Sequence, residues 1–422
     1  MKSPETNKKP ELLAPAGDFE KLQIAVAYGA DAVYLSGTSF GLRAKAKNFN
    51  NDELAAAISY AHSHGVRVYV TANIFARNKD IEEMTGYFKS LAKMGADAFI
   101  VSDPGVLMLA KKEAPDVEIH ISTQANTTNY ASVKFWKNAG ASRIILAREL
   151  NLAEIAEIKA KICQEDVSIL LEGFVHGAMC MSYSGRCMLS RYMTAGKPAA
   201  DSQPDGARDA NLGACAHPCR YNYRLYAEEA SRPGYFMPVE ESEFGTDIFS
   251  AEDLCMVEHI PALITAGLES FKIEGRIKTA FYVGLAAKAY RLAIDAAFDN
   301  KSISGCLDML KMASHRPFST GFYFDKPKEG QASYSRSHDF VGIVRDYNYK
   351  TGCALIEQRN VFEASDTLTF VPPKGENFNV SITEMYGENG DKLDRAPHAR
   401  QKILLKLNKP VEELTLVCRE IV

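Results

Sequence analysis

The chain lacks any uninterrupted apolar run long enough to cross a bilayer, although 46% of its 422 residues are hydrophobic. Its first ten residues, MKSPETNKKP, contain no apolar stretch of the kind that a secretory leader needs. We therefore expect a cytoplasmic protein without a membrane partner, in a compartment where thiols are kept reduced. There the nine cysteines favour metal binding or redox use over disulfide bonds.

A strong net charge is also lacking, because 49 Lys and Arg face 53 Asp and Glu, which gives −4. This excludes a global electrostatic attraction to nucleic acid, so such a partner must meet a local basic patch. One candidate patch follows the second expected strand and another surrounds a cysteine cluster. An ordinary solvated surface is the alternative for both. The two patches are Arg43, Lys45 and Lys47, and Arg186, Arg191 and Arg220.

Four cysteines lie within forty residues: Cys180, Cys187, Cys215 and Cys219. Thiolates are soft ligands, and four of them are what an iron–sulfur cluster or a tetrahedral zinc ion requires. The six-residue gap between the first two fits the tight pairs of zinc modules poorly, so we favour iron–sulfur ligation. Structural zinc is the alternative, and four unligated buried thiols are a further one.

Short apolar segments alternate with amphipathic helical segments over the first 300 residues, a pattern typical of βα units. Glycines such as Gly65, Gly95, Gly140 and Gly267 end several of the expected helices. The expected strands are residues 11–17, 32–36, 67–73, 98–102, 118–124, 143–148, 168–176 and 269–274. The expected helices are residues 19–30, 52–64, 80–94, 105–113, 130–139, 152–162, 251–266 and 280–298.

Eight such units predict a closed (β/α)8 barrel of the TIM type, an α/β fold whose chemistry lies at the carboxyl ends of its strands. A doubly wound open sheet is the alternative, since a local pattern does not prove closure. The segment of residues 177–249, here called the cysteine insertion, follows the seventh strand and carries all four clustered cysteines. We therefore expect it to lie over the mouth of the barrel.

Alternation along the strands places polar side chains at the same mouth. Lys272, Glu274 and Arg276 share one face of the last strand, and three charges in register cannot all face the helix layer. The same reasoning groups three further sets of residues, and a convergence of titratable groups is typical of an active site. These sets are Glu172, Phe174 and His176; His120, Ser122 and Gln124; and Tyr69, Thr71 and Asn73.

Structural explanations stay open for the same residues. The three charges of the last strand are also compatible with an ion-pair network that closes the barrel end. A lone His176 is compatible with a strand cap that makes one hydrogen bond. Glu172 is compatible with a carboxylate that accepts hydrogen bonds from backbone amides of the cysteine insertion.

After the barrel the pattern changes to strands alone, and an Asn389-Gly390 turn signal supports a small all-β barrel domain. We expect a catalytic barrel domain over residues 1–299, a connector over 300–337 and the β-barrel domain over 338–422. The six strands expected in it are residues 340–347, 353–360, 366–371, 378–386, 402–407 and 415–421.

Several long motifs resemble one known family, the collagenase-like peptidases of family U32, almost from end to end. They are ELLAPAG at 11–17, GADAVY at 29–34, SDPG at 102–105, the segment 172–190 and KIEGR at 272–276. Within that family the chain is most similar to the branch of tRNA hydroxylation proteins. The resemblance implies oxygen-independent conversion of the wobble uridine of tRNA to 5-hydroxyuridine.

The resemblance further implies that Cys180, Cys187, Cys215 and Cys219 hold a [4Fe–4S] cluster and that prephenate is a cosubstrate. One departure is that the segment between Cys187 and Cys215 is longer than in relatives where a glycine–cysteine pair follows sooner, which affects the assignment of the last two ligands. The expected partner is the anticodon loop of tRNA, and some relatives work as pairs of homologous subunits, so a second subunit or copy is a further expectation.

Hydroxylation of a ring carbon needs a redox centre that no side chain supplies, and an anticodon base is already unpaired and cheap to extrude. We expect Arg276 and Lys272 to hold a dicarboxylate, because an Arg fork binds a carboxylate through two hydrogen bonds. Glu172 or His176 would accept the proton of the ring carbon. The remaining candidates are Glu274 in catalysis, and Gln124, Asn73 and Arg43 in substrate binding.

Two rival functions come from other classes. A peptidase would suit the family label, but the sequence contains no zinc-protease helix motif or nucleophilic serine elbow. Cys180 with His176 imitates a cysteine–histidine pair, although a thiolate that binds iron is not free to attack a carbonyl. The other rival is an RNA-binding adaptor without catalysis, which the polar barrel mouth argues against.

Overall fold

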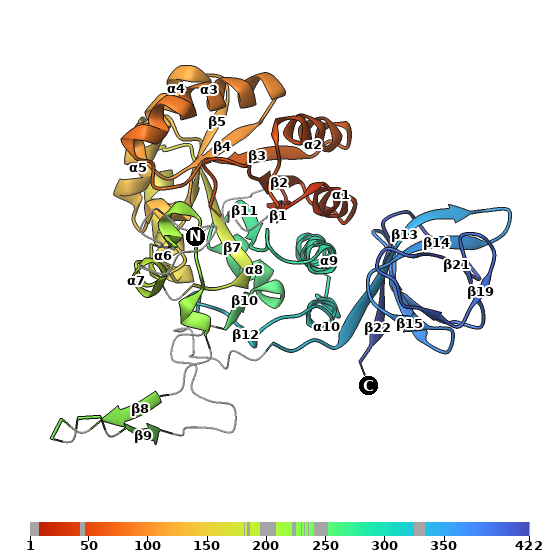
Figure 1. Ribbon diagram of the computed structural model, residues 1–422. Helices are drawn as coiled ribbons and strands as arrows, with labels where there is room; N and C mark the ends of the chain where they lie inside the picture. The colour runs from red at the N-terminus through yellow and green to blue at the C-terminus, as the bar shows by residue number, and fades with distance from the viewer. Residues whose placement is uncertain are drawn as a thin grey trace.

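A closed barrel of eight parallel strands forms the first part of the molecule (Figure 1). In this computed structural model the described residues are 8–42, 47–180, 182–183, 186–194, 208–221, 225–228, 230–231, 233–234, 236–239, 252–299, 301–324 and 334–421. The barrel strands are β1 Glu11–Pro15, β2 Ala32–Leu35, β3 Arg67–Thr71, β4 Ala98–Val101, β5 Glu118–Ile121, β6 Arg143–Ile145, β7 Leu170–Ala178 and β11 Ser270–Ile273.

The last strand closes the barrel, because β11 pairs in parallel with both β1 and β7. Every residue of β2 and β4 is buried, as strands covered on both faces require. These two strands read AVYL and AFIV, so their near-continuous apolar composition follows from the layer of helices outside and the packed interior inside. The predicted (β/α)8 barrel is confirmed, and the open sheet is excluded.

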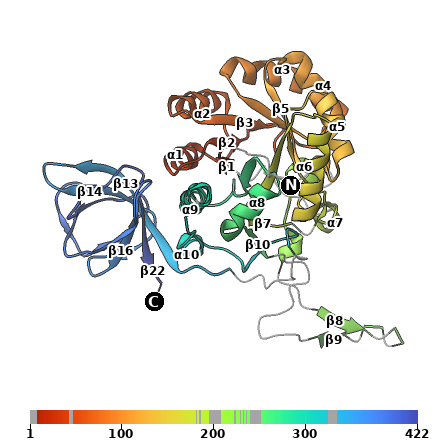
Figure 2. The same cartoon turned by 180° about the vertical axis from the view of Figure 1, so that it is seen from behind.

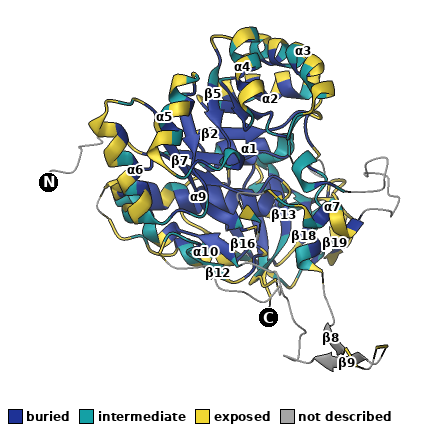
Figure 3. Cartoon of the chain, turned by 90° about the vertical axis from the view of Figure 1, so that its left-hand side faces the viewer, coloured by how far each residue is buried: buried dark blue, intermediate teal, exposed yellow. Residues whose placement is uncertain are grey.

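Helices surround the barrel and turn their apolar sides toward it. Figure 3 shows the result, with the buried strands in dark blue and the exposed outer surfaces of the helices in yellow. Asn50 and Asn151 begin two of them with capping boxes closed by Glu53 and Glu154, a direct sequence signal for a helix start. The helices are α1 Phe19–Ala27, α2 Asn51–Ser63, α3 Asn78–Met94, α4 Pro104–Glu113, α5 Tyr130–Asn138, α6 Leu152–Gln164, α8 Ile260–Thr265 and α9 Ala280–Phe298. In the part of the chain that the structure describes, none of the helices is long and apolar enough to span a membrane.

The helix expected over residues 251–266 is wrong in its first half. A short strand, β10 Asp253–Cys255, runs antiparallel to the extended end of β7. Asp253 is buried and pairs with Arg316 at 2.7 Å, which fixes this segment against the chain after the barrel. Tertiary pairing therefore overrides the local helical pattern, and α8 begins at Ile260 after a 3-10 turn, η5 Val257–His259.

The cysteine insertion leaves the barrel at the carboxyl end of β7. Its described part contains one short helix, two 3-10 turns and a hairpin that extends away from the barrel (Figures 1 and 2). These elements are α7 Leu189–Thr194, η3 Ala210–Leu212, η4 Pro218–Arg220, β8 Leu225–Glu228 and β9 Phe236–Val239.

A curled all-β domain forms the C-terminal part, as predicted. Its main sheet has the order β17-β16-β22-β13-β14-β21-β18-β19. The single strand expected over 378–386 is two strands, because β17 pairs with β16 whereas β18 pairs with β21. Bounds are β13 His338–Asn348, β14 Cys353–Gln358, β15 Phe362–Glu363, β16 Thr367–Val371, β17 Phe378–Ser381, β18 Met385–Gly387, β19 Lys392–Leu393, β20 Arg395–Ala396, β21 Lys402–Lys406 and β22 Leu416–Glu420; before them lie α10 Cys306–Lys311 and β12 Phe318–Ser319.

The C-terminal domain lies against α1 and α9 of the barrel, as both Figure 1 and Figure 2 show. Tyr28, at the end of α1, is 1% exposed and donates its hydroxyl to the carbonyl oxygens of Val371 and Leu414, at 2.6 and 3.0 Å. The same hydroxyl accepts the amide hydrogen of Leu416 at 3.0 Å. The buried hydroxyl of Tyr28 therefore links the barrel domain to the C-terminal domain.

Replacing Tyr28 with Phe should lower the free energy of unfolding by about 1 to 3 kcal/mol, because the buried amide of Leu416 then loses its acceptor. Urea denaturation followed by circular dichroism measures the change. Tyr349→Phe is the control, since Tyr349 is 81% exposed and should change stability by less than about 0.5 kcal/mol. Equal midpoints for the two variants would refute the docking role of Tyr28.

Candidate active site

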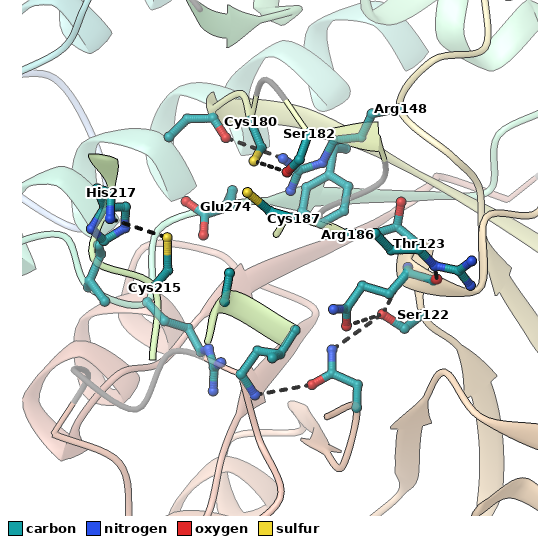
Figure 4. Close-up of a pocket in the computed structure, with 18 of the residues that line it drawn as sticks. Ser122, Thr123, Arg148, Cys180, Ser182, Arg186, Cys187, Cys215, His217 and Glu274 are labelled. Atoms are coloured by element: carbon teal, nitrogen blue, oxygen red, sulfur yellow. Dashed lines mark hydrogen bonds between the residues drawn. The ribbon is translucent and has the colours of Figure 1, made fainter. Parts of the chain in front are cut away.

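A cavity of about 610 Å³ opens at the carboxyl ends of the barrel strands, beneath the cysteine insertion. Strand ends form its floor and the insertion forms its opposite wall (Figure 4). Among the described residues that line it are six cationic side chains and one carboxylate, that of Glu274. The cavity therefore attracts anions although the whole chain carries a net charge of −4. The six cations are Arg148, Arg186, Arg220, Lys272, Arg276 and Lys278.

All four clustered cysteines line this cavity. Figure 4 shows the sulfur atoms of Cys180, Cys187 and Cys215 directed toward the space that the Glu274 carboxylate also faces. Burial raises the pKa of the Cys219 thiol, Arg220 partly offsets this, and the three other cysteines raise it further. The Cys219 thiol therefore lies within electrostatic reach of the three other cysteines.

Metal-binding geometry is a separate question from this proximity. All nine cysteines of the chain are free thiols. Within the described ranges, no group of three Cys, His, Asp or Glu side chains is arranged to hold a metal ion. The thiol of Cys180 instead lies 2.7 Å from the hydroxyl of Ser182, and the amide of His217 donates to the sulfur of Cys215 at 3.3 Å.

Side-chain hydrogen bonds to the backbone hold the cysteine segments in place. The side-chain amide of Asn211 donates to the carbonyl of Cys187 at 3.0 Å and accepts from its amide at 3.1 Å. The buried hydroxyl of Ser190 donates to the carbonyl of Arg208 at 2.6 Å and accepts from the amide of Ala216 at 2.9 Å. The described part of the insertion thus has little regular secondary structure near its cysteines, and side-chain hydrogen bonds from Asn211 and Ser190 hold its backbone there.

The barrel side of the cavity carries several of the predicted polar residues. Lys272, at the third position of β11, is 4% exposed, and Glu274 and Arg276 follow in the loop after the strand. Arg276 is 3% exposed and donates to the hydroxyl of Thr71 at 3.4 Å. Asn73, Ser122 and Gln124 line the same cavity and are linked to one another by hydrogen bonds of 3.3 and 3.4 Å.

Gly17, the last residue of the ELLAPAG motif, explains part of that motif. A Cβ at this position would lie 1.9 Å from the carbonyl oxygen of Arg276. The absence of a side chain therefore lets the loop after β1 approach the segment that presents Arg276 to the cavity.

A buried ion-pair network lies one layer below the cavity. Glu172, which is 0% exposed, lies 3.3 Å from the ammonium of Lys272 and 2.9 Å from the guanidinium of Arg143. Arg143 also binds both carboxylate oxygens of Glu11. Burial alone would raise the pKa of Glu172, but Lys272 and Arg143 outweigh it and hold this pKa below its usual range. Burial lowers the pKa of Lys272, which Glu172 opposes.

His176 does not line the cavity, and the prediction that it shares a face with Glu172 and Phe174 is wrong. The pairing of β7 with β11 shifts by one residue at Val175, so His176 lies opposite Ile273. This reverses the alternation beyond Phe174. The ring packs among Tyr282, Tyr290 and Phe318, and burial lowers its pKa to about 3, which keeps it neutral.

The other predicted residues divide into three groups. Gln124, Asn73, Lys272, Glu274 and Arg276 line the cavity together with the cysteines. Glu172 does not reach it and acts on it through Lys272. Arg43, and Lys45 of the same expected patch, lie outside the described residues.

Two arginines of the site escaped the sequence reasoning. Arg143 carries the buried network, and alternation along β6 would have found it, because Ile145 two residues later lines the cavity. Arg148 lies 3.9 Å above the ring of Phe174 and donates to the carbonyl of Ala178 at 3.3 Å. No local sequence signal identifies Arg148, because its position depends on the loop after β6.

Comparison with known proteins places the chain among relatives of similar length. Residues 17–333 match the family described as Peptidase family U32, and residues 336–417 match the Peptidase family U32 C-terminal domain. The tRNA hydroxylation protein P1 of Bacillus subtilis is 39% identical over 413 residues, which cover 96% of this chain and 93% of that protein.

Two relatives from Escherichia coli are also similar. The tRNA hydroxylation protein P is 34% identical over 448 residues, with 96% of this chain and 95% of that protein covered. The 23S rRNA 5-hydroxycytidine C2501 synthase is 33% identical over 341 residues, which cover 79% of this chain and 48% of that protein.

Replacing Arg143 with Met should lower the free energy of unfolding by roughly 3 to 5 kcal/mol at neutral pH, because the buried Glu172 loses one of its cations. Glu172 has a lowered pKa in the fold, so it stabilises the protein above the ordinary carboxyl range and loses this effect as the pH falls through the lowered pKa. The variant raises that pKa and should lose the effect at a higher pH.

Urea denaturation of this variant at neutral pH and near pH 4 measures both effects. Lys402→Met is the matched control, because its pair with Glu388 joins side chains that are 49% and 56% exposed and contributes about 0 to 1 kcal/mol. Equal losses in the two variants at neutral pH would show that the buried network does not stabilise the barrel.

Proposed function

The chain belongs to peptidase family U32, and from this membership we propose that it is an enzyme that hydroxylates RNA, with tRNA as its substrate. The observation that carries the proposal is that four cysteines line the same cavity as Lys272 of β11 and Arg276 of the loop after it. The names of the relatives support it, since two are tRNA hydroxylation proteins and a third is a hydroxycytidine synthase of ribosomal RNA.

The finer form of the proposal is a prephenate-dependent conversion of the wobble uridine to 5-hydroxyuridine without molecular oxygen. In this reaction a hydroxyl group replaces the hydrogen on C5 of the base, a two-electron oxidation for which prephenate, as the cosubstrate of this proposal, would be the electron acceptor. An unpaired base of the anticodon loop suits a cavity at the end of a barrel, because a base that is not in a duplex costs little to extrude.

The chemistry of the donor set, four thiols that line one cavity, suits an iron–sulfur cluster. Cys180, Cys187, Cys215 and Cys219 would hold it, and four soft thiolates match [4Fe–4S] ligation. The amide of His217 already donates to the sulfur of Cys215, and such hydrogen bonds tune cluster potentials. When bound, the cluster supplies the electron transfer that no side chain provides. Zinc is the alternative occupant of the same thiolates.

The chain's own residues would bind the substrates and move the proton. Arg276 and Lys272 both line the cavity and would bind the two carboxylates of prephenate. Glu172 beneath Lys272 favours its charged form. Because Glu274 is the described carboxylate of the cavity, we assign it the proton that leaves C5, in preference to Glu172 or His176. Asn73 and Gln124 would contact the base edge.

A peptidase mechanism has less support in the geometry. The cysteine–histidine pair that it would use is not formed, because the ring of His176 packs among Tyr282, Tyr290 and Phe318, while the thiol of Cys180 contacts Ser182 on the cavity side. A pure RNA adaptor would use the cations of the cavity but would not need the Glu274 carboxylate and the four cysteines that lie beside them.

Protein purified without air should be brown, with iron, sulfide and visible charge-transfer absorbance, and Cys187→Ala should remove most of this absorbance. Loss of one of four thiolate ligands destabilises the cluster. Cys163→Ala is the control, since Cys163 is an exposed thiol of α6 and should leave the spectrum unchanged. Colourless protein with one equivalent of zinc would support the structural-metal alternative.

Nucleoside mass spectrometry of tRNA tests the function itself. A strain without this gene should lose 5-hydroxyuridine, the wild-type gene should restore it, and Arg276→Gln should reduce its rate of formation by roughly 10- to 100-fold, because a charged hydrogen-bonding group is lost. The iron content of this variant should stay at the wild-type level. Arg336→Gln is the control, because its side chain is 53% exposed, pairs with Asp339 and is not among the residues that line the cavity. Unchanged 5-hydroxyuridine in the deletion strain would refute the proposed function.

A further inference from the structure

A second, smaller groove of about 300 Å³ lies beside the main cavity and shares Arg186 with it. We propose that this groove binds a nucleotide of single-stranded RNA next to the base in the main cavity, with its phosphate on two arginines and its base on Phe75. This proposal rests on the proposed function and adds a second subsite to it. The described residues that line the groove are Phe75, Arg77, Arg186, Asp209, Asn211 and Leu212.

The two walls of the groove come from distant parts of the chain. Phe75 and Arg77 lie in the loop before α3, and Asp209, Asn211 and Leu212 lie around η3 of the cysteine insertion. The amide of Phe75 donates to the carbonyl of Asn211 at 3.2 Å, which fastens the walls together. Since Arg186 borders both hollows, a ligand can run from one into the other, as consecutive nucleotides do.

The charge of the groove favours a phosphate. Arg186 is held by one hydrogen bond, from its Nε to the carbonyl of Gln124 at 3.0 Å, and its guanidinium lies 5.6 Å from the ring centre of Phe75. Among the described residues, no acceptor binds its terminal Nη atoms, and the side chain of the exposed Arg77 likewise has no described partner. A fixed guanidinium with open donors matches a phosphate oxygen pair.

The acidic residue of the groove does not cancel this charge. Asp209 is 6% exposed, accepts the amide hydrogen of Asn211 at 2.8 Å and lies 3.8 Å from Arg191. The side chain of Asn211 is likewise engaged with the backbone of Cys187. The groups left to a ligand are therefore the two guanidinium groups, the aromatic ring and Leu212.

The aromatic ring distinguishes a nucleotide from a simple anion. Phe75 is half-buried and lines the groove, and an aromatic ring beside cations is the arrangement on which single-stranded nucleic acids stack their bases. The volume of about 300 Å³ lies at the small end of the range for ligand pockets. A free carboxylate such as that of prephenate would use the arginines but not the ring.

Binding of an anticodon stem–loop RNA to the full-length protein, purified without air, tests the subsite by fluorescence anisotropy. Phe75→Ala should weaken binding about tenfold through lost stacking. Arg77→Gln should reduce the slope of log Kd against log salt by about one, as the loss of one phosphate contact requires. Phe135→Ala is the control, because Phe135 is an exposed aromatic residue of α5 outside the groove and should bind RNA as the wild type does.

Two further RNAs, each with an abasic nucleotide on a different side of the target uridine, complete a double-mutant cycle with Phe75→Ala. On one of the two abasic RNAs the wild type should lose about tenfold in affinity, and Phe75→Ala should cause no additional loss. Circular dichroism checks the folding of Phe75→Ala, and if this variant does not fold, the abasic effect on the wild type and the salt slope of Arg77→Gln decide the proposal.

The outcomes separate this proposal from the proposed function. If the wild type binds and hydroxylates the RNA while both groove variants and both abasic RNAs bind with unchanged affinity, the subsite is refuted and the function stands. Arginine effects without a Phe75 or abasic effect would show a site for a free anion and also refute the nucleotide subsite. A wild type that neither binds nor modifies RNA would refute both proposals.

Discussion

The ion pair of Glu172 with Lys272 and Arg143 is the interaction on which the architecture of the site depends. It joins β7, β11 and β6 in the interior of the barrel, where a lone charge would be strongly destabilising. The strand pairing of β7 with β11 closes the barrel, and β7 then continues into the cysteine insertion. The buried network therefore holds Lys272 at the cavity floor. It also holds β7, the strand that leads into the cysteine insertion.

Much of the fold could be predicted from the sequence because it depends on local pattern. Apolar runs, helix caps and glycine stops marked the βα units, and the position of the cysteines after the seventh strand indicated that they lie over the barrel mouth. The errors occurred where distant contacts decide the local structure. The segment at Asp253 pairs with β7 and with Arg316, and residues 378–386 divide between two partner strands.

The candidate site was predicted in outline for a similar reason. Lys272 lines the cavity as alternation along β11 predicts, and Glu274 and Arg276 line it from the loop after that strand, whereas His176 lies beyond an irregularity at Val175 that no periodic pattern reveals. Arg148 reaches the cavity from the loop after β6 and Arg186 from the cysteine insertion, so their positions depend on how these two loops fold. The net charge of −4 likewise did not predict the charge of the cavity, because the six cations that line it are outnumbered by acidic residues elsewhere in the chain.

Asn211 occupies an unusual place, because it contributes to two walls at once. Its side chain holds the backbone of Cys187, and its carbonyl accepts a hydrogen bond from Phe75 at the groove. A shift of the chain at Phe75 is therefore passed to Cys187 through one residue. If a ligand binds the groove, its binding and the placement of the Cys187 thiol are then linked equilibria, and each biases the other to the same extent.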